Sequence, residues 1–372
     1  MDIEACGASG ITQSTALPPP PTVWICSFLP GATGAGVERF AVLLRNALSK
    51  SGKKAVIVDI DVLGGSRRIP KTFRYYSAWR IGRHINGRAS PGDAVVCSNF
   101  FSWNARRDHS IVVYHGTDMG RAISTRSEMG FLRNATVRTI GTFLEKRTGR
   151  GRTVVTVSNS AKEEVEKHYG LRVDAVIPNA VDLDMFRPAD KKLELRERFG
   201  LPKDKFLMLF VGTPDPRKGL GWIFEELVPR FNAGQHLVVR SDTTLTSKSA
   251  TVVGRLPLDQ LADLYRACDV FLFPTLYEGY SFTLVEALAC GLPAVTSPAG
   301  GGRDLLDVPE LRSFIISRKD PDAYMKCLER LQSSKEEYAQ ASSAARAYAE
   351  KNCSIPHFEK AYVELIEKAL AR

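Results

Sequence analysis

The sequence predicts an α/β protein with two domains, each built on a doubly wound, parallel β-sheet. Three observations support this fold class. The chain has 372 residues, which is enough for two separate cores. Short apolar runs alternate with amphipathic helical patterns in two series. Between the series, residues 177–188 form a turn-rich segment that includes Pro178 and Pro188, as is typical of a hinge.

The first series begins with a buried strand expected at residues 22–27. A glycine-containing loop follows at residues 30–36, and a helix is expected from Val37. The apolar residues of this helix recur at helical spacing and form one stripe: Phe40, Ala41, Leu44, Ala47 and Leu48. Further strands are expected at residues 54–59, 94–97, 111–114 and 154–157.

The second series begins with the apolar run at residues 206–211, and further strands are expected at residues 236–240, 251–253, 269–273 and 293–296. A last helix is expected from about Pro356 to Leu370. The predicted domains are residues 22–182 and 183–350, followed by a C-terminal helical segment at residues 351–372. Residues 1–21 end in a proline run and are expected to form a flexible tail, without the charged start and apolar centre of a signal peptide.

The sequence argues against a membrane-spanning protein and against a metal site built from cysteines. No apolar run approaches the roughly 20 residues that span a bilayer. Seven cysteines are scattered without the pairing of a metal site, and several lie in apolar segments. We therefore expect them to be reduced and buried, as in a cytoplasmic protein.

The net charge of +10 is unevenly distributed. Residues 66–152 contain 17 Lys and Arg but only 5 Asp and Glu. Such a basic region attracts nucleic acid, phosphorylated ligands or anionic membranes. Because no nucleic-acid recognition motif is present, nucleic acid is the weaker alternative. We favour a peripheral contact with the inner face of an anionic membrane. The alternative is that the arginines only make one face of the protein soluble.

Two glutamates, Glu278 and Glu286, bracket the start of a helix. The strand at residues 269–273 precedes them, and Ser281 stands where a helix N-cap is expected. The helix ends at Gly291-Leu292-Pro293. Two glutamates at this spacing are usually solvated charges. A loop at the carboxyl end of a buried strand is, however, where ligands bind in open α/β sheets, and a helix N-terminus favours phosphate.

This segment resembles the E-x7-E donor-site signature of the retaining GT-B glycosyltransferases of family GT4, also called glycosyltransferase group 1. Glu278, Glu286-Ala287 and Gly291-Leu292-Pro293 match it, and the resemblance extends over residues 22–372. It implies a GT-B fold, with two Rossmann-like domains facing across a cleft. The first domain would bind the acceptor and the second the nucleotide-sugar, with the C-terminal helix packing back on the first domain.

The resemblance also implies roles for the residues of this segment. Glu278 would hold sugar hydroxyls, and Glu286 would hold the ribose hydroxyls. The four residues after Glu278 would direct backbone N–H groups toward the sugar and phosphate: Gly279, Tyr280, Ser281 and Phe282. Neither glutamate is required as an acid or base.

A second cluster of candidate residues follows the strand at residues 206–211. Arg217 and Lys218 stand before Gly219, and adjacent cations there suit a departing diphosphate. An exposed basic loop is the alternative. Thr213 occupies a position where the family usually has arginine, whereas Arg217-Lys218-Gly219 resembles a variant of the lipopolysaccharide-core glucosyltransferases.

The glycine-rich loop that ends at Gly36 is a further candidate for donor contact, since glycine permits close approach to a phosphate or sugar. Gly34-Ala35-Gly36 with Asp59 downstream also resembles part of a dinucleotide-binding loop. Arg39 stands at the third glycine position, where its bulk opposes close helix–strand packing. An NAD(P)-dependent oxidoreductase is therefore the weaker of the two interpretations.

Four remaining features of the sequence bear on the expected site. His115 follows the strand at residues 111–114, where the family commonly has a histidine near the donor sugar, although a lone histidine is often structural. Leu256 belongs to the region expected to choose the base. Asp59-Ile60-Asp61 is a possible Mg²⁺ or Mn²⁺ motif, but it lies far from the E-x7-E segment, so no metal and no cofactor are assigned. Ser158 is read as an ordinary helix cap.

These features predict a retaining glycosyltransferase that uses a UDP- or GDP-linked sugar as co-substrate. A glycan or lipid-linked acceptor is expected, as in surface polysaccharide or lipopolysaccharide-type biosynthesis. Two alternatives stay open: a GT-B epimerase or phosphorylase, and the oxidoreductase.

Overall fold

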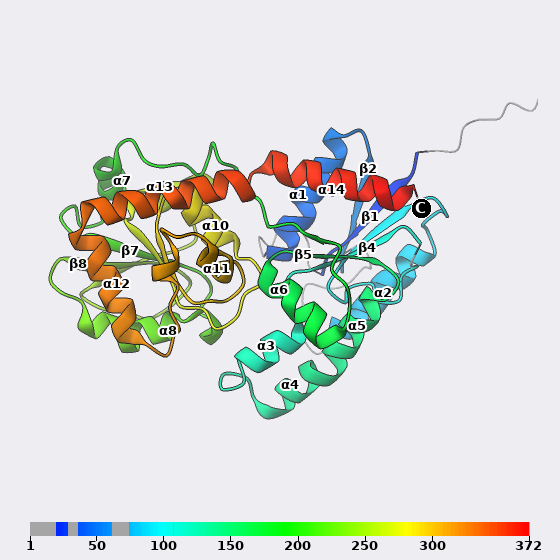
Figure 1. Ribbon diagram of the computed structural model, residues 1–372, viewed down its shortest axis with the longest axis horizontal. Helices are drawn as coiled ribbons and strands as arrows, with labels where there is room; N and C mark the ends of the chain where they lie inside the picture. The colour runs from blue at the N-terminus through cyan, green and yellow to red at the C-terminus, as the bar shows by residue number, and fades with distance from the viewer. Residues whose placement is uncertain (1–19, 29–35, 62–73, 107, 372) are drawn as a thin grey trace, which may run out of the picture.

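The chain folds into two α/β domains that lie side by side (Figure 1). A computed structural model describes residues 20–28, 36–61, 74–106 and 108–371. The expected flexible tail and the glycine-rich loop before Gly36 lie largely outside these residues.

The first domain contains a parallel sheet in the order β2-β1-β3-β4-β5-β6. Its strands agree with the predicted ranges to within one or two residues, except for the short β6, which was not predicted. The strands are β1 (Thr22–Cys26), β2 (Lys54–Val58), β3 (Ala94–Ser98), β4 (Ser110–Tyr114), β5 (Thr153–Thr156) and β6 (Ala175–Val176).

The helices of the first domain cover this sheet and connect its strands. They are α1 (Gly36–Lys50), α2 (Arg74–Asn86), α3 (Asp118–Ser124), α4 (Phe131–Thr136), the π-helical turn η3 (Val137–Gly141), α5 (Thr142–Gly149), α6 (Asn159–Glu164) and η4 (Val165–Tyr169). The predicted apolar stripe of α1 is buried, as expected. Ser158 is confirmed as the cap of α6, since its hydroxyl accepts the Ala161 N–H at 3.0 Å.

The second domain contains a parallel sheet in the order β11-β10-β7-β8-β9. Its strands are β7 (Phe206–Val211), β8 (Gln235–Arg240), β9 (Ala250–Val253), β10 (Val270–Phe273) and β11 (Ala294–Thr296), all close to the predicted ranges. Its helical segments are α7 (Lys192–Arg198), η5 (Pro216–Lys218), α8 (Leu220–Trp222), η6 (Ile223–Leu227), η7 (Val228–Arg230), α9 (Leu258–Ala267), α10 (Phe282–Ala289), α11 (Gly301–Asp304), η8 (Leu305–Asp307), η9 (Arg312–Phe314) and α12 (Pro321–Ser333).

Two C-terminal helices join the domains. The helix α13 (Lys335–Asn352) packs on α10, and α14 (Ile355–Leu370) packs on α1, β3 and β4 of the first domain. Figure 1 shows them running from one domain to the other along one side of the molecule. Phe358 and Tyr362 make edge contacts with Phe40, with ring centroids 5.8 and 5.4 Å apart. The crossing helix is therefore confirmed, while the exact domain boundaries stay a prediction.

Two further expectations concern the described residues. Within them, no helix is both long and apolar enough to cross a membrane. Six of the seven cysteines lie in this part of the chain, and all six are buried and free.

Candidate functional site

A cavity of about 720 Å³ lies between the two domains, lined by residues from both. Its walls bring together the carboxyl-end loops of β4, β7 and β10 and the start of α1. All eleven residues singled out from the sequence line it: Gly36, His115, Arg217, Lys218, Leu256, Glu278, Gly279, Tyr280, Ser281, Phe282 and Glu286. The fold thus gathers the candidates, and their individual roles stay predictions.

A larger hollow of about 930 Å³ lies elsewhere, between the η8 region and α13. Three carboxylates, Asp304, Asp307 and Glu310, line it with a single cation, Lys351. This charge balance repels an anionic ligand. The interdomain cavity is therefore the better candidate for a phosphate-containing substrate.

Glu278 is held in an ion pair with Arg217. One carboxylate oxygen lies 2.7 Å from Arg217 Nη1, which also donates to the Tyr277 carbonyl. Arg217 belongs to η5, whose N-cap Asp215 accepts the Arg217 N–H at 3.0 Å. Although burial acts to lower it, Glu278 and Asp215 raise the pKa of Arg217 above its ordinary value. The guanidinium therefore stays charged and is fixed in orientation.

Glu286 is also paired with an arginine, and this pair links the domains. Arg39 Nη1 of α1 lies 2.6 Å from one oxygen of Glu286, whose side chain is fully buried. The hydroxyl of Tyr265 donates to the other oxygen at 3.0 Å. The Arg39 guanidinium lies 4.2 Å from the ring centroid of Phe282. Sequence reasoning treated Arg39 only as a residue unsuited to a dinucleotide loop and missed this pairing.

The cavity has two further cations. Among the described residues, neither Lys218 nor Arg240 has a carboxylate partner, and the buried Nε of Arg240 has no hydrogen-bond partner. Arg240 is the last residue of β8, the strand next to β7. Its place at a strand's carboxyl end was the signal that could have found it. With both carboxylates already paired, the cavity carries a surplus of positive charge.

His115 contributes a neutral imidazole to the cavity. Burial lowers the pKa of His115 to about 3, so its ring is uncharged at neutral pH. Its Nε2 is buried and has no hydrogen-bond partner among the described residues. The ring packs against the edge of Phe40, with centroids 4.6 Å apart. An unsatisfied buried nitrogen on a cavity wall is suited to a hydrogen bond with a ligand.

The start of α10 is arranged differently from a fully capped helix. Ser281 occupies the N-cap position, as predicted, but its side chain makes no capping bond. Its hydroxyl instead pairs with that of Thr283 at 2.7 Å. The serine side chain therefore leaves the first-turn N–H groups to other partners, such as a phosphate.

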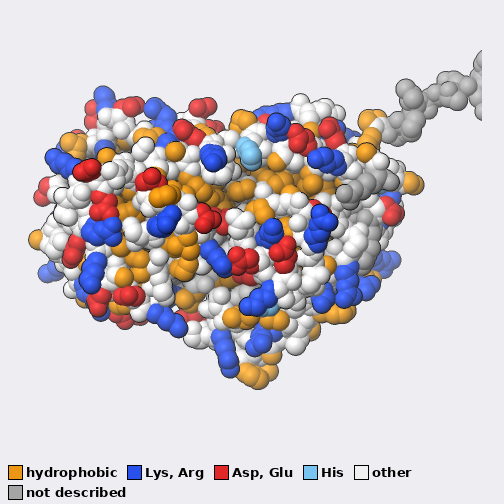
Figure 2. Space-filling model, viewed as in Figure 1, with side chains coloured by type: hydrophobic (Ala, Val, Ile, Leu, Met, Phe, Trp, Pro, Cys, Tyr) orange, Lys and Arg blue, Asp and Glu red, His pale blue; other side chains and the backbone are white. Residues whose placement is uncertain are grey.

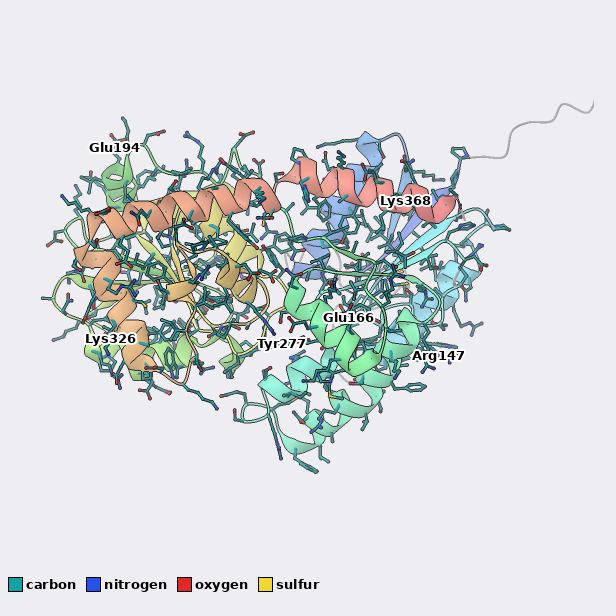
Figure 3. The ribbon with its side chains drawn as sticks, viewed as in Figure 1. Arg147, Glu166, Glu194, Tyr277, Lys326 and Lys368 are labelled. Carbon is teal, nitrogen blue, oxygen red and sulfur yellow. The ribbon has the colours of Figure 1, made fainter. Side chains whose placement is uncertain are left out.

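The loop before α10 makes close contact with the first domain. A Cβ placed on Gly279 would lie 2.1 Å from the His115 carbonyl oxygen, so only glycine fits here. The buried Tyr277 hydroxyl accepts the Thr117 N–H and lies 2.8 Å from a Glu164 carboxylate oxygen, to which it donates. Figure 3 shows Tyr277 at the junction of the domains. Sequence reasoning missed these contacts, since nothing local marks them.

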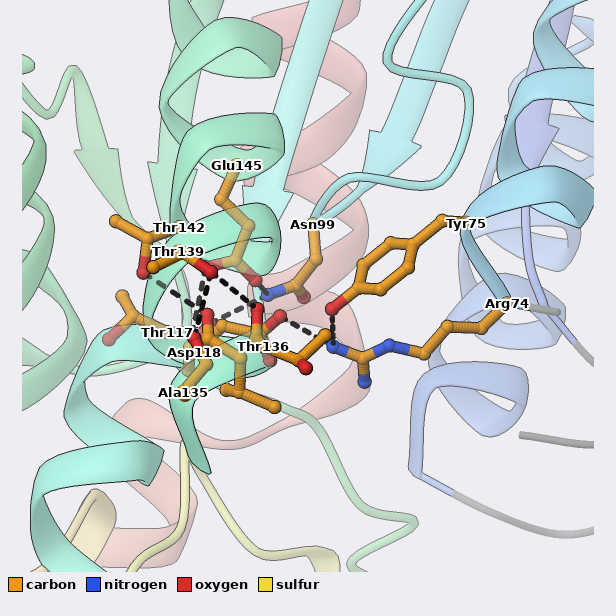
Figure 4. Close-up of polar contacts among 12 residues, drawn as sticks. Arg74, Tyr75, Asn99, Thr117, Asp118, Ala135, Thr136, Thr139, Thr142 and Glu145 are labelled. Carbon is orange, nitrogen blue, oxygen red and sulfur yellow. Dashed lines mark hydrogen bonds and ion pairs between the residues drawn. The ribbon is translucent and has the colours of Figure 1, made fainter. Parts of the chain in front are cut away.

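A buried polar network supports the loop that carries His115 (Figure 4). The Asn99 side-chain amide donates to the Gly116 carbonyl at 2.7 Å and to Glu145 at 2.8 Å. Glu145 also accepts the Asp118 N–H at 2.8 Å, and Asp118 pairs with Arg74 at 2.6 Å. Burial and the Asp118 charge raise the pKa of Glu145 to about 8. These contacts fix the backbone around His115.

Solved structures with the same architecture define the fold class. A sucrose-phosphate synthase from Thermosynechococcus elongatus superposes with a TM-score of 0.80 at 16% identity, covering 94% of this chain and 99% of that chain. WaaG, a glycosyltransferase involved in lipopolysaccharide biosynthesis, gives a TM-score of 0.67 at 18% identity, covering 92% and 99%. The fold is therefore that of the GT-B glycosyltransferases.

Sequence comparisons match the second half of the chain to one glycosyltransferase family. Residues 205–334 match the family model described as "Glycosyl transferases group 1". A D-inositol 3-phosphate glycosyltransferase of Xylanimonas cellulosilytica is 32% identical over 213 residues, 50% of this chain and 51% of that protein. The putative teichuronic acid biosynthesis glycosyltransferase TuaC of Bacillus subtilis is 28% identical over 190 residues, 50% and 48%. The chain spans about half the length of these curated relatives. The match to the group 1 glycosyltransferases therefore covers part of the chain that contains the E-x7-E segment, while the GT-B fold extends over 94% of this chain.

Proposed function

We propose that this protein transfers a sugar from a UDP- or GDP-linked donor to a glycan or lipid-linked acceptor, with retention at the anomeric carbon. One observation carries the proposal: both carboxylates of the cavity are already paired with arginines, so Lys218 and Arg240 are left for an anionic ligand. A nucleoside diphosphate supplies the matching charge. The Anabaena protein HepE, a structural neighbour with a TM-score of 0.69 at 14% identity over 93% of this chain and 99% of that one, was solved with UDP-glucose.

The cations are assigned to the departing diphosphate. Negative charge grows on the leaving phosphate as the bond to the sugar breaks, and a fixed cation stabilises that change most in a cavity from which water is excluded. Arg217 is oriented by Glu278, while Lys218 is free to approach the phosphate. Their charge replaces that of a metal ion, so we expect transfer to continue in the presence of a chelator.

The polar groups around the cations are assigned to hydroxyls. A carboxylate accepts about four hydrogen bonds, so Glu278 and Glu286 retain lone pairs beside their arginine partners. Glu278 would accept from the sugar and Glu286 from the ribose. The unpartnered Nε2 of His115 would bond a sugar hydroxyl. Backbone N–H groups of residues 279–282 would face the sugar and phosphate, with Gly36 and Leu256 lining the nucleotide end.

Retention is implied by the family resemblance, and the same pairing bears on how it would be achieved. Among the described residues that line the cavity, the only carboxylates are Glu278 and Glu286, and each is neutralised by an arginine. An ion-paired carboxylate is a weak nucleophile. We therefore favour front-face displacement, in which the acceptor hydroxyl attacks the anomeric carbon and passes its proton to the departing phosphate oxygen.

The substitution Lys218→Ala tests the proposal. We expect kcat to fall about 10²- to 10³-fold with an unchanged melting temperature, because the lost charge acts mainly in the transition state. Lys319→Ala, at an exposed site on the second domain, is the matched control. Near-normal turnover by the Lys218 variant would contradict the assignment.

A ligand screen separates the alternatives. We expect UDP or GDP to raise the melting temperature and NAD(P) to leave it unchanged. Stabilisation by NAD(P) alone would support an oxidoreductase. Donor turnover that needs no acceptor and yields an epimer or a sugar phosphate would support the epimerase or phosphorylase.

A further inference from the structure

Apolar side chains project into solvent from a continuous helical segment of the first domain. The segment comprises α4, η3 and α5, residues 131–149, and we call its outward face the α4–α5 surface. Phe131 is 85% exposed, Leu132 80%, Phe143 63% and Ile140 48%. The opposite side of the same segment is buried against the domain, through Val137 and Leu144 among others. Exposed aromatic and aliphatic side chains grouped in this way mark an interaction surface.

The same surface is strongly basic. Residues 131–150, which are this segment and the residue after it, contain five Lys and Arg and one acid, Glu145, which is buried. The five cations are Arg133, Arg138, Lys146, Arg147 and Arg150. Arg133 and Arg138 are exposed, and in the described part of the chain no carboxylate forms an ion pair with either. Figure 2 shows Lys and Arg beside hydrophobic side chains at the lower tip of the molecule, over α3 and α4.

We propose that the α4–α5 surface docks on a membrane that contains anionic lipid. Aromatic and aliphatic side chains enter the boundary between headgroups and acyl chains, while arginines beside them bind anionic headgroups. A second copy of the chain is a poor occupant, because a two-fold interface would place these cations against themselves. The surface carries no exposed acid between residues 129 and 150 to offset that repulsion.

The position of the surface relates it to the cavity. The helix α3, which packs on η3, begins at Asp118, three residues after His115. Docking would therefore hold the first domain, and with it the wall of the cleft that carries His115, near the lipid. This inference goes beyond the proposed sugar transfer and does not depend on it, since it concerns binding to lipid alone.

Vesicle sedimentation with the full chain tests the inference. We expect binding to phosphatidylcholine vesicles that contain about 30 mol % phosphatidylglycerol, and little binding to phosphatidylcholine alone. Raising the salt from about 0.1 to about 1 M should weaken binding at least about tenfold. Phe131→Ser with Leu132→Ser, and separately Arg133→Glu with Arg138→Glu, should each weaken it about tenfold or more.

Matched controls lie on the second domain. Leu193→Ser removes an apolar side chain that is 58% exposed, and Lys326→Glu with Lys335→Glu changes the net charge as the arginine pair does. Both should bind vesicles like the unaltered chain, and all variants should keep their melting temperature and their shift with UDP. Equal binding to both lipid compositions, or unaltered binding by the surface variants, would overturn the inference. So would a dimer that the Phe131 and Leu132 changes dissociate.

Discussion

A single added methyl group at Gly279 should uncouple the two domains. The Cβ of alanine would lie 2.1 Å from the His115 carbonyl oxygen and 2.9 Å from the Gly116 nitrogen. Ordinary contacts begin at 3.4 Å, so the loop and the end of β4 must move apart by about 1.3 Å. These atoms belong to the backbone and cannot rotate away. Gly279 does not have a positive φ, so alanine does not strain the loop itself.

The expected effect is large on catalysis and small on folding. A misplacement of about 1 Å can cost about 10²-fold in rate, so kcat/KM should fall by about that factor, or about 2.7 kcal/mol. The backbone N–H of residue 279, which we assign to the donor, is retained in the variant. Each domain keeps its own core, and we expect the melting temperature to change by only a few degrees.

The assay is the initial rate of nucleoside diphosphate release at several donor concentrations. The control is Gly254→Ala, at a glycine with no atom within 4 Å of the added Cβ and no positive φ. We expect that control to retain the unaltered kcat/KM. A Gly279→Ala enzyme within threefold of it would refute the inference that the observed contact between the domains is the catalytically competent one.

Two further predictions concern the polar contacts beside this loop. Tyr277→Phe removes a buried hydroxyl that is bonded to Glu164. The change should destabilise the closed arrangement of the domains by about 1–3 kcal/mol, so that the KM for the donor rises about fivefold or more. Tyr76→Phe, at an exposed site, is the control and should leave this KM unchanged. The pKa of Glu145 is raised from 4.5 to about 8, so its contribution to stability is complete below about pH 4.5 and is lost as the pH rises through about 8. Glu145→Gln should flatten the fall in melting temperature between about pH 5 and 8, and an unchanged pH profile would contradict this. Glu166→Gln, at an exposed site, is the control.

Much of the fold could be predicted because its signals are local. The strand at residues 206–211 is buried on both faces and therefore appears as a continuous apolar run, and the strand at residues 236–240 has the apolar centre Leu237-Val238-Val239. Alternation with helices then requires parallel sheets. The two-residue strand β6 was missed, since Ala175 and Val176 are too few to show a period.

The candidate site was predictable where its residues follow strands. Glu278 and Lys218 stand in loops after β10 and β7, and His115 follows β4, so each position could be read from the strand before it. The α4–α5 surface was predictable only as excess charge. The sequence would have suggested that the phenylalanines of this surface are buried in the core, because it does not show which side of a helix stays exposed to solvent.

The sequence by itself determined the two sheets, the last helix and the E-x7-E segment, because periodicity and turn residues act between neighbours in the chain. That the last helix packs back on the first domain was implied only by the family resemblance. The tertiary structure alone decided the electrostatics of the site. Arg39 and Glu286 are 247 residues apart, and Arg217 and Glu278 are 61 apart. Such partners depend on the order of strands and on how the domains face each other. That arrangement neutralises both glutamates and leaves Lys218 and Arg240 without a carboxylate partner among the described residues, as the proposed diphosphate site requires.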